Sequence, residues 1–310
     1  MNTAQNYWDI LKRQPRPLTF FASRILWRTH ACGLFTIHKE GYRLKFHPTA
    51  LSATLWIDPQ SRQEDEIFLK RYLRRGDTFV DVGANIGQLT LAAASLVGEK
   101  GKVYSVEPHP RTYGFLCANV ALNKYSNIHL FNLALDNKES DIFFADLGRS
   151  DVQNRVSENA YGIAMKTAKL DGLPITEQDI RLLKIDVEGY EKFVLEGATE
   201  TLNRTSCVYF ESWECHFERY NYTCRDITGL LLQNHFKVVR FTGDHSLAPV
   251  NTDYSSKALE NLVAVRDMDD FFEQNATASD RINVMDPHAH MLTRRTAQAP
   301  KRSVLVRLGI

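Results

Sequence analysis

The most constraining feature of this sequence is an alternation of short apolar runs and amphipathic segments that begins after Gly76. This order indicates parallel strands whose sheet is covered by helices on both faces. The expected strands occupy residues 78–82, 102–106, 128–134, 182–185 and 207–210, and the expected helices 86–97, 111–123 and 190–201. Residues 236–241 and 261–265 predict an antiparallel edge pair. The predicted fold class is therefore a doubly wound α/β fold with a mostly parallel, seven-stranded sheet.

Further elements flank or interrupt this sheet. Residues 141–145 and 164–170 predict an inserted hairpin with a polar tip at 148–161. Before the first strand, the pattern predicts a hairpin from 34–38 and 41–48, and an amphipathic helix over 64–73. We divide the chain into an N-terminal helical and hairpin extension (1–75), the doubly wound domain (76–267), and a C-terminal helix with a basic, poorly ordered tail (268–310).

The bulk properties argue against several classes of protein, although the near-neutral charge leaves room for a local basic patch. The 310 residues carry a formal net charge of +1, so no long-range field attracts nucleic acid and no such partner is expected. No run approaches the roughly 20 apolar residues of a membrane span. No secretion signal is evident, so a cytoplasmic protein is expected. The apolar segment 18–35 contains Arg24, Arg28 and His30; a helix packed on the domain is our interpretation, and a membrane-surface helix is the alternative.

Cysteine and histidine positions predict no metal site. The five cysteines form no Cys-x-x-Cys pair and are odd in number, which indicates free thiols. The step from Cys215 to Cys224 matches no metal-ligand spacing. His288 and His290 have no further ligand nearby in the sequence.

The first strand of the doubly wound domain runs directly into a glycine turn, Asp81-Val82-Gly83-Ala84-Asn85-Ile86-Gly87. Ligands of open α/β sheets bind at this end of the strands. Glycine has no Cβ, so it lets the backbone approach a ligand closely. The Gly-x-x-x-Gly spacing fits neither the dinucleotide fingerprint nor a nucleotide P-loop. A nucleoside with an amino-acid tail would suit this loop, and an ordinary tight turn is the alternative.

The second strand ends in an acid, Glu107, about twenty-five residues beyond the loop. A carboxylate at this position can accept hydrogen bonds from both ribose hydroxyls of an adenosine. The loop and the acid together predict an adenosine-binding cleft. A surface acid without a ligand is the alternative for Glu107.

These blocks together resemble the FkbM-type methyltransferases, a Rossmann-like branch of the S-adenosylmethionine-dependent enzymes. Over roughly residues 60–266, the resemblance rests on the glycine turn, Glu107-Pro108, residues 119–123, 132–136 and 183–191, and Glu211. The resemblance implies that the cofactor is S-adenosylmethionine. In such enzymes the glycine turn contacts the methionine part of the cofactor, the acid at the position of Glu107 binds the ribose, and the residues after the third strand flank the adenine. The implied cofactor-binding residues are Asp81, Gly83, Ala84, Asn85, Gly87, Glu107, Ala134, Leu135 and Asp136.

Methyl transfer requires an acceptor atom held roughly 3 Å from the methyl carbon, and a hydroxyl acceptor also requires a base. The strand order places Asp186 at the tip of the fourth strand and Glu188 in the following turn. We expect Asp186 to act as the base or to orient the acceptor, with Glu188 second. Capping of the next helix is the alternative for both acids. His216 is a third candidate, because imidazole exchanges protons near neutrality; a solvated loop histidine is the alternative.

Acceptor contacts are expected from Glu211 and Trp213 after the fifth strand, and from Asn154 and Arg155 in the hairpin tip. The resemblance implies hydroxyl acceptors on sugars, glycans or natural-product-like small molecules, so O-methylation is the leading hypothesis. A cofactor-binding module without catalysis is the alternative. An NAD-dependent oxidoreductase would need a Gly-x-Gly-x-x-Gly turn that the first strand lacks. The acceptor and the oligomeric state are left open.

Overall fold

The computed structural model describes residues 15–144, 162–242 and 246–275. The expected hairpin tip with Asn154 and Arg155, and the basic C-terminal tail, lie outside the described residues. Within the described ranges, no helix combines the length and the apolar character that crossing a membrane would require. All five cysteines fall in these ranges and are free thiols, as the sequence predicted.

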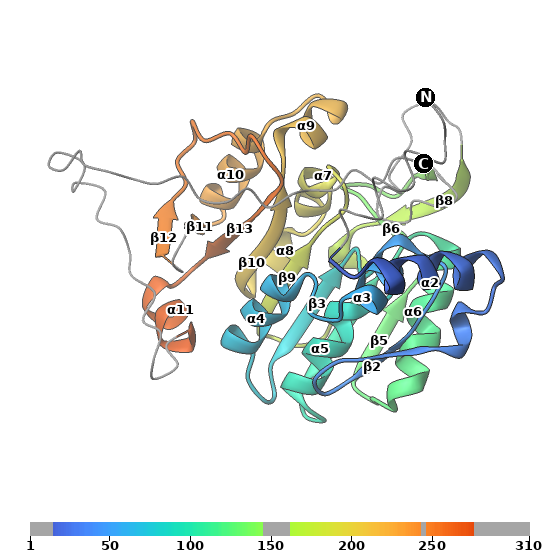
Figure 1. Cartoon of the computed structure of the whole chain (residues 1–310). Coiled ribbons are helices and arrows are strands. Elements are labelled where there is room, and N and C mark those ends of the chain that lie inside the picture. Colours follow the sequence, from blue (N-terminus) through green and yellow to red (C-terminus); the bar gives the residue numbers. More distant parts are fainter. Residues whose placement is uncertain (1–14, 145–161, 243–245, 276–310) are drawn as a thin grey trace, which may run out of the picture.

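An eight-stranded sheet runs through the molecule (Figure 1). Its parallel part consists of β3 (Thr78–Val82), β4 (Lys102–Val106), β5 (Ile128–Phe131), β9 (Ile180–Ile185) and β10 (Thr205–Ser212). The antiparallel part consists of β13 (Glu260–Val265), β11 (Lys237–Thr242) and β12 (Ser246–Pro249). The order across the sheet is β12-β11-β13-β10-β9-β3-β4-β5. This order confirms the doubly wound, mostly parallel class with antiparallel edge strands.

The sequence prediction was wrong in the number of strands and in the course of one helix. The sheet has eight strands rather than seven, because the short segment Ser246–Pro249 pairs with β11 and buries Leu247. The helix expected over residues 190–201 is two helices, α7 (Glu191–Glu196) and α8 (Thr199–Asn203). The break falls at Gly197, where a Cβ would lie 2.2 Å from the backbone oxygen of Asp136.

The strands place alternate side chains into two apolar cores, one on each face of the sheet. Val80 and Ile185 belong to the core that contains α7, α8 and α10 (Cys224–Gln233). Phe79 and Leu182 belong to the core that contains α4 (Gln63–Tyr72) and α5 (Gln88–Val97), with α6 (Pro110–Asn123) beside it. Burying one such side chain contributes about 1.5–3 kcal/mol. The two cores therefore fix the ends of the central strands, where the loops discussed below begin.

The N-terminal segment packs onto the second of these cores through residues 37–73, while α2 (Pro17–Arg28) and a 3-10 turn (Cys32–Leu34) pack in a smaller cluster with Phe46 and Ala53. It also contains the hairpin β1 (Thr36–His38) and β2 (Arg43–Lys45), and helices α3 (Ala50–Ile57) and α4. The hairpin was predicted and α3 was not. Asn119 of α6 ties this segment to the sheet: its Oδ1 accepts a hydrogen bond from Lys45 N (2.8 Å), and its Nδ2 donates one to Ile86 O (2.7 Å). α2 contacts α3 and buries Phe20, but Leu18 stays exposed.

The predicted insertion is present as the antiparallel pair β7 (Asp141–Phe144) and β8 (Ile163–Ala168). β6 (Ala134–Leu135) pairs in parallel with β8, so the third parallel strand ends at Phe131, earlier than expected. The remaining short elements are two 3-10 turns (Leu170–Gly172 and Glu218–Tyr220), α9 (Glu214–Phe217) and α11 (Met268–Asn275).

Candidate active site

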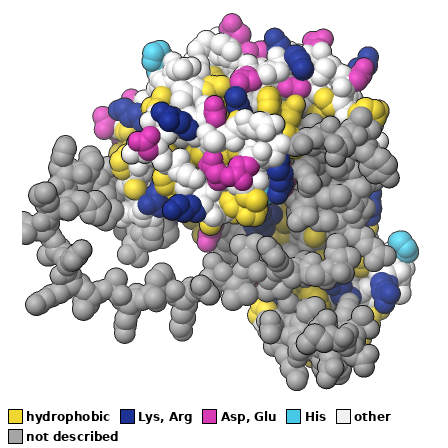
Figure 2. Space-filling model, turned by 90° about the horizontal axis from the view of Figure 1, so that it is seen from above, with side chains coloured by type: hydrophobic (Ala, Val, Ile, Leu, Met, Phe, Trp, Pro, Cys, Tyr) yellow, Lys and Arg dark blue, Asp and Glu magenta, His cyan; other side chains and the backbone are white. Residues whose placement is uncertain are grey.

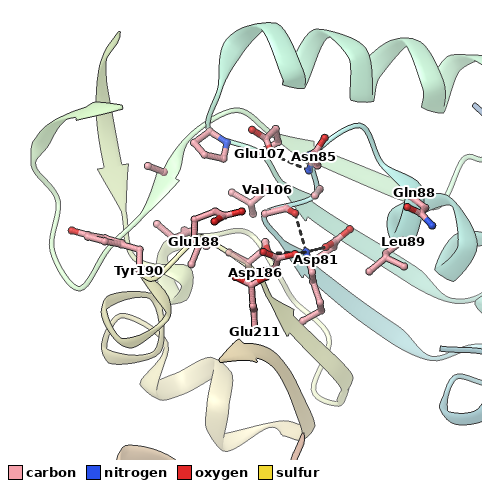
Figure 3. Close-up of a pocket in the computed structure, with 18 of the residues that line it drawn as sticks. Asp81, Asn85, Gln88, Leu89, Val106, Glu107, Asp186, Glu188, Tyr190 and Glu211 are labelled. Atoms are coloured by element: carbon pink, nitrogen blue, oxygen red, sulfur yellow. Dashed lines mark hydrogen bonds and ion pairs between the residues drawn. The ribbon is translucent and has the colours of Figure 1, made fainter. Parts of the chain in front are cut away.

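A cavity lies at the carboxyl ends of β3, β4 and β9, where the strand order of the sheet reverses between β3 and β9. Such switch points are where open α/β sheets bind ligands. The cavity is partly open to solvent and has a volume of about 120 Å³. Figure 3 shows Glu107 and Asn85 together at its upper rim, with Asp186, Glu188 and Glu211 below them.

Ten of the residues singled out from the sequence line this cavity: Asp81, Gly83, Ala84, Asn85, Glu107, Ala134, Leu135, Asp186, Glu188 and Glu211. Four others are described but do not line it: Gly87, Asp136, Trp213 and His216. The sequence and the sheet topology thus bring together side chains that are up to 130 residues apart, from Asp81 to Glu211 (211 − 81 = 130).

The two glycines of the turn lie where other parts of the protein approach the backbone closely. Gly83 has φ +80°, and a Cβ there would lie 1.8 Å from the backbone oxygen of Asp186. Gly87 has φ +88°, and a Cβ there would lie 2.5 Å from Leu116 Cδ1. Both glycines therefore let two protein segments approach each other closely, and their expected approach to a ligand stays a prediction.

Glu107, at the end of β4, is 7% exposed. Its Oε2 accepts a hydrogen bond from Asn85 N (2.9 Å) and its Oε1 accepts one from His109 N (3.0 Å). Asn132 Nδ2 donates to the backbone oxygen of Glu107 (2.9 Å) and so fixes the loop. Each carboxylate oxygen keeps a further lone pair for a ligand hydroxyl. Burial raises the pKa of Glu107 to about 7, although the two backbone N–H groups oppose the rise.

Lys184 is the buried cation beneath the cavity, and sequence reasoning missed it. Its Nζ lies 3.2 Å from Asp81 Oδ1 and 3.8 Å from Asp186 Oδ2, and it donates a hydrogen bond to Gly83 O (2.8 Å). Burial disfavours the ammonium charge, but Asp81 and Asp186 outweigh this and raise the pKa of Lys184. Thr90 Oγ1 also donates to Asp81 Oδ2 (2.7 Å). Lys184 thus joins β9 to the glycine turn, and Asp81 holds it there.

Asp186 follows β9 directly, and its backbone N donates to Val82 O (3.1 Å). Its side chain is 35% exposed and lines the cavity. It caps no helix, because α7 begins at Glu191 after Tyr190, and this end has no side-chain cap. The capping alternative therefore does not apply to Asp186.

Glu188 sits in a loop that Glu191 organises. Glu191 is fully buried, and its Oε1 accepts hydrogen bonds from Val187 N (3.0 Å) and Gly189 N (3.3 Å). Glu188 has a left-handed backbone with φ +56°, and it lines the cavity. Burial, followed by the charges of Asp186 and Glu191, raises the pKa of Glu188 to about 8.

His216, in α9, lies behind the cavity wall. Its Nδ1 is 3.4 Å from Glu211 Oε2 and 3.6 Å from Glu188 Oε2. The ring of Trp213 lies 4.5 Å from the ring of His216, centroid to centroid. Trp213 therefore packs on the histidine, and its expected contact with an acceptor stays a prediction.

Asp136, which follows β6, acts on the cavity through a neighbour. It is buried, and its Oδ2 accepts a hydrogen bond from the hydroxyl of Tyr190 (3.1 Å), whose side chain lines the cavity. A direct contact between Asp136 and a cofactor stays a prediction.

The N-terminal segment supplies lining residues that sequence reasoning did not single out: Leu51 from α3, and Arg62 and Asp65 at the start of α4. Asp65 accepts hydrogen bonds from the Tyr209 hydroxyl (2.6 Å) and from Asn261 Nδ2 (3.0 Å), which fixes it against β10 and β13. No local pattern marks these residues, because only the packing of α4 beside the sheet brings them to the cavity.

The cavity residues fit an adenosine that carries an amino-acid tail on a positively charged sulfur. Glu107 keeps acceptor capacity for the ribose hydroxyls, and the apolar Val106, Leu133 and Leu135 line the neighbouring wall. Carboxylates lie further along the cavity, where a sulfonium would be attracted. The fold and the site define the class of S-adenosylmethionine-dependent methyltransferases.

The chain belongs to the FkbM methyltransferase family. The family model described as the methyltransferase FkbM domain matches residues 81–238, which contain the glycine turn, Glu107, Asp186, Glu188 and Glu211. This match confirms the resemblance drawn from the sequence.

Curated relatives match over shorter stretches. The Sulfolobus acidocaldarius protein named "Probable cobalt-precorrin-6B C(15)-methyltransferase (decarboxylating)" is 34% identical over 74 residues, 23% of this chain and 38% of that protein. The tRNA(Phe) (4-demethylwyosine(37)-C(7)) aminocarboxypropyltransferase of Methanocaldococcus jannaschii is 30% identical over 108 residues, 34% of this chain and 40% of that protein. The chain thus spans less than half the length of these relatives.

Solved structures with a similar arrangement include methyltransferase FkbM from Methylobacillus flagellatus KT, at 14% identity and a TM-score of 0.41, covering 69% of this chain and 52% of that one. Another is a SAM-dependent methyltransferase from Aquifex aeolicus, at 17% identity and a TM-score of 0.40, covering 71% of this chain and 98% of that one.

Proposed function

We propose that this protein transfers the methyl group of S-adenosylmethionine to a hydroxyl of a sugar, a glycan or a natural-product-like small molecule. The observation that carries the proposal is that Glu107 and the acids Asp186, Glu188 and Glu211 line one continuous cavity. A ribose held at Glu107 leaves the carboxylates facing the part of the cavity where an acceptor would enter.

The charge of the cavity favours neutral, hydroxyl-rich acceptors. Carboxylates accept hydrogen bonds from hydroxyl groups, and they repel phosphate and carboxylate groups at short range. On the face seen in Figure 2, basic and acidic side chains are interspersed, and the described surface there carries no extended basic area of the kind that binds nucleic acid. These features support a small polyhydroxylated acceptor.

Asp186 is the residue we assign to the acceptor proton. The cofactor supplies a methyl carbon bonded to a positively charged sulfur. Asp186 is partly exposed in the cavity and caps no helix, so a carboxylate oxygen is available to accept the hydroxyl proton as the new bond forms. Lys184 Nζ lies 3.8 Å from Asp186 Oδ2, and its positive charge helps to hold that side chain in place. Glu107 and Asn85 would hold the nucleoside while this occurs.

An assay of methyl transfer over a panel of sugars and hydroxylated metabolites, with carboxylate and phosphate compounds beside them, tests the proposal. Turnover on hydroxyl compounds is expected. Asp186→Asn should lower kcat by about 10²–10⁴-fold, the usual contribution of a positioned base, with cofactor Kd within a few-fold. The exposed Asp179→Asn is the matched control and should leave both unchanged. Cofactor binding without transfer to any hydroxyl would support the non-catalytic module instead.

A further inference from the structure

Three side chains from separate elements converge at one side of the cavity. Glu188 comes from the loop after β9, Glu211 from the end of β10, and His216 from α9. One oxygen of each glutamate and one ring nitrogen of His216 lie within 4.8 Å of one another. We call these three residues the Glu-Glu-His cluster.

The fold holds this cluster in place from two sides. Gly189 has φ +100°, and a Cβ there would lie 2.6 Å from the backbone oxygen of His216, so the two loops touch backbone to backbone. The hydroxyl of Tyr222 donates to Gly189 O (2.7 Å). Glu191 binds the backbone of the same loop, and Trp213 packs on the His216 ring. The loop that carries Glu188 and the ring of His216 are therefore held in place before any ligand arrives.

The nearest basic group to the two carboxylates of the cluster, among the described residues, is His216 itself. Glu211 is 8% exposed, and its Oε2 makes no hydrogen bond with any described residue. In the described part of the chain, no lysine or arginine nitrogen lies within 4.0 Å of the carboxylate of Glu188 or Glu211. The positive charges of Arg62 and Arg219 lower the pKa of Glu188 from further away, while the negative charges of Asp186 and Glu191 raise it. Buried carboxylates are normally paired or coordinate a metal.

We propose that Glu188, Glu211 and His216 bind a divalent cation of the Mn²⁺ or Zn²⁺ type at the acceptor side of the cavity. Two carboxylate oxygens and an imidazole nitrogen suit ions that accept both hard and borderline ligands. Ligands about 2.1 Å from a shared ion are about 3.0–3.4 Å apart at angles near 90–110°. The observed 3.4 Å and 3.6 Å from His216 Nδ1 to the two oxygens need only a small contraction.

The role of this ion rests on the proposed function. Glu188 and Glu211 line the cavity, so an ion held between them would lie at the cavity wall, where an acceptor could take a coordination position left open by the protein. An acceptor hydroxyl bound there would lose its proton more readily. The O–H proton passes to Asp186, the oxygen–methyl bond forms, and the carbon–sulfur bond breaks with its electron pair left on sulfur.

Metal binding can be measured without methyl transfer. The full chain, stripped with a chelator and dialysed, is titrated with MnCl₂, and free Mn²⁺ is followed by electron paramagnetic resonance with no cofactor or acceptor present. One equivalent should bind. Glu211→Gln and Glu188→Gln should each weaken binding at least tenfold, whereas the exposed Glu218→Gln, on the neighbouring turn, should not. Circular dichroism checks that each variant is folded. Glu188 lies in a loop and is partly exposed, so Glu188→Gln should fold and can test metal binding even if Glu211→Gln unfolds.

Cobalt supplies a second readout. Co²⁺ bound to wild type should give visible absorption bands that change in His216→Ala. The proposal is overturned if neither Mn²⁺ nor Co²⁺ binds stoichiometrically, or if all three cluster variants bind like wild type; His216 would then simply form an ion pair with the two glutamates. Methyl transfer that persists in chelator, with no metal bound, would reject the role of the ion in the reaction and would leave the proposed methyltransferase function standing. Stoichiometric metal binding without methyl transfer to any acceptor would support the metal site and reject the proposed methyltransferase function.

Discussion

Replacing Gly83 with alanine puts a methyl group where the loop after β9 already lies. The new Cβ would be 1.8 Å from the backbone oxygen of Asp186 and 2.9 Å from its carbonyl carbon. Gly83 also has φ +80°, a left-handed conformation that side-chain-bearing residues avoid. The variant therefore tests whether the turn and the Asp186 loop are held together by this close approach.

The expected cost has two parts. A left-handed backbone at a non-glycine residue costs about 1–3 kcal/mol. To reach an ordinary contact, the Asp186 carbonyl must move by more than about 1 Å, and strain from such overpacking costs about 1–3 kcal/mol. The same movement disturbs the hydrogen bond from Asp186 N to Val82 O (3.1 Å). Together these effects should lower the free energy of unfolding by about 2–6 kcal/mol.

Urea denaturation monitored by circular dichroism measures this loss. The matched control is Gly114→Ala in α6, where an added Cβ meets nothing within 4 Å. Because this helical position accepts alanine without strain, the control should be stabilised by about 0.4–1 kcal/mol. The reasoning would be refuted if Gly83→Ala unfolded at the same urea concentration as wild type. A stable Gly83→Ala would mean that the approach of the two loops is not as close as described.

Three further results are expected. Lys184→Met should lower the free energy of unfolding by about 3–5 kcal/mol, because it leaves Asp81 buried without its cation. The control is the exposed Lys100→Met. Equal denaturation midpoints for the two variants would contradict a stabilising role of the Lys184–Asp81 ion pair. Glu107→Gln should weaken cofactor binding about 10–150-fold in calorimetry, the equivalent of one lost charge-assisted hydrogen bond, with the exposed Glu139→Gln unchanged. Since burial raises the pKa of Glu107 to about 7, protonation should weaken cofactor binding as pH falls below about 7. Glu107→Gln should remove that dependence, and a wild-type Kd that is flat from pH 8 to 6 would count against the ribose assignment.

The parts of the site that lie on strand ends could be predicted from the sequence. Parallel strands bring their carboxyl ends to one edge, so the order of the chain places Gly83, Glu107 and Asp186 together. The strands β3 and β4 have the bounds that the apolar runs predicted. Hydrophobic patterning fixes such elements strongly because both faces are buried.

What could not be predicted depends on contacts between distant segments. Lys184 looks like one polar residue in an apolar strand until Asp81 is seen 3.2 Å away. Arg62 reaches the cavity only through the packing of α4. The Glu-Glu-His cluster has no ligand spacing along the sequence, since 22 residues separate Glu188 from Glu211 (211 − 188 − 1 = 22). The division of the chain into three parts and the cytoplasmic location stay predictions.

The most direct test of the account is a crystal structure of the full chain with S-adenosylhomocysteine. We expect the ribose hydroxyls within hydrogen-bond distance of the Glu107 carboxylate, the adenine beside Leu135, and the sulfur facing Asp186. An empty cavity at saturating ligand, or a nucleoside bound away from Glu107, would contradict the central claim that this cavity holds the methyl donor.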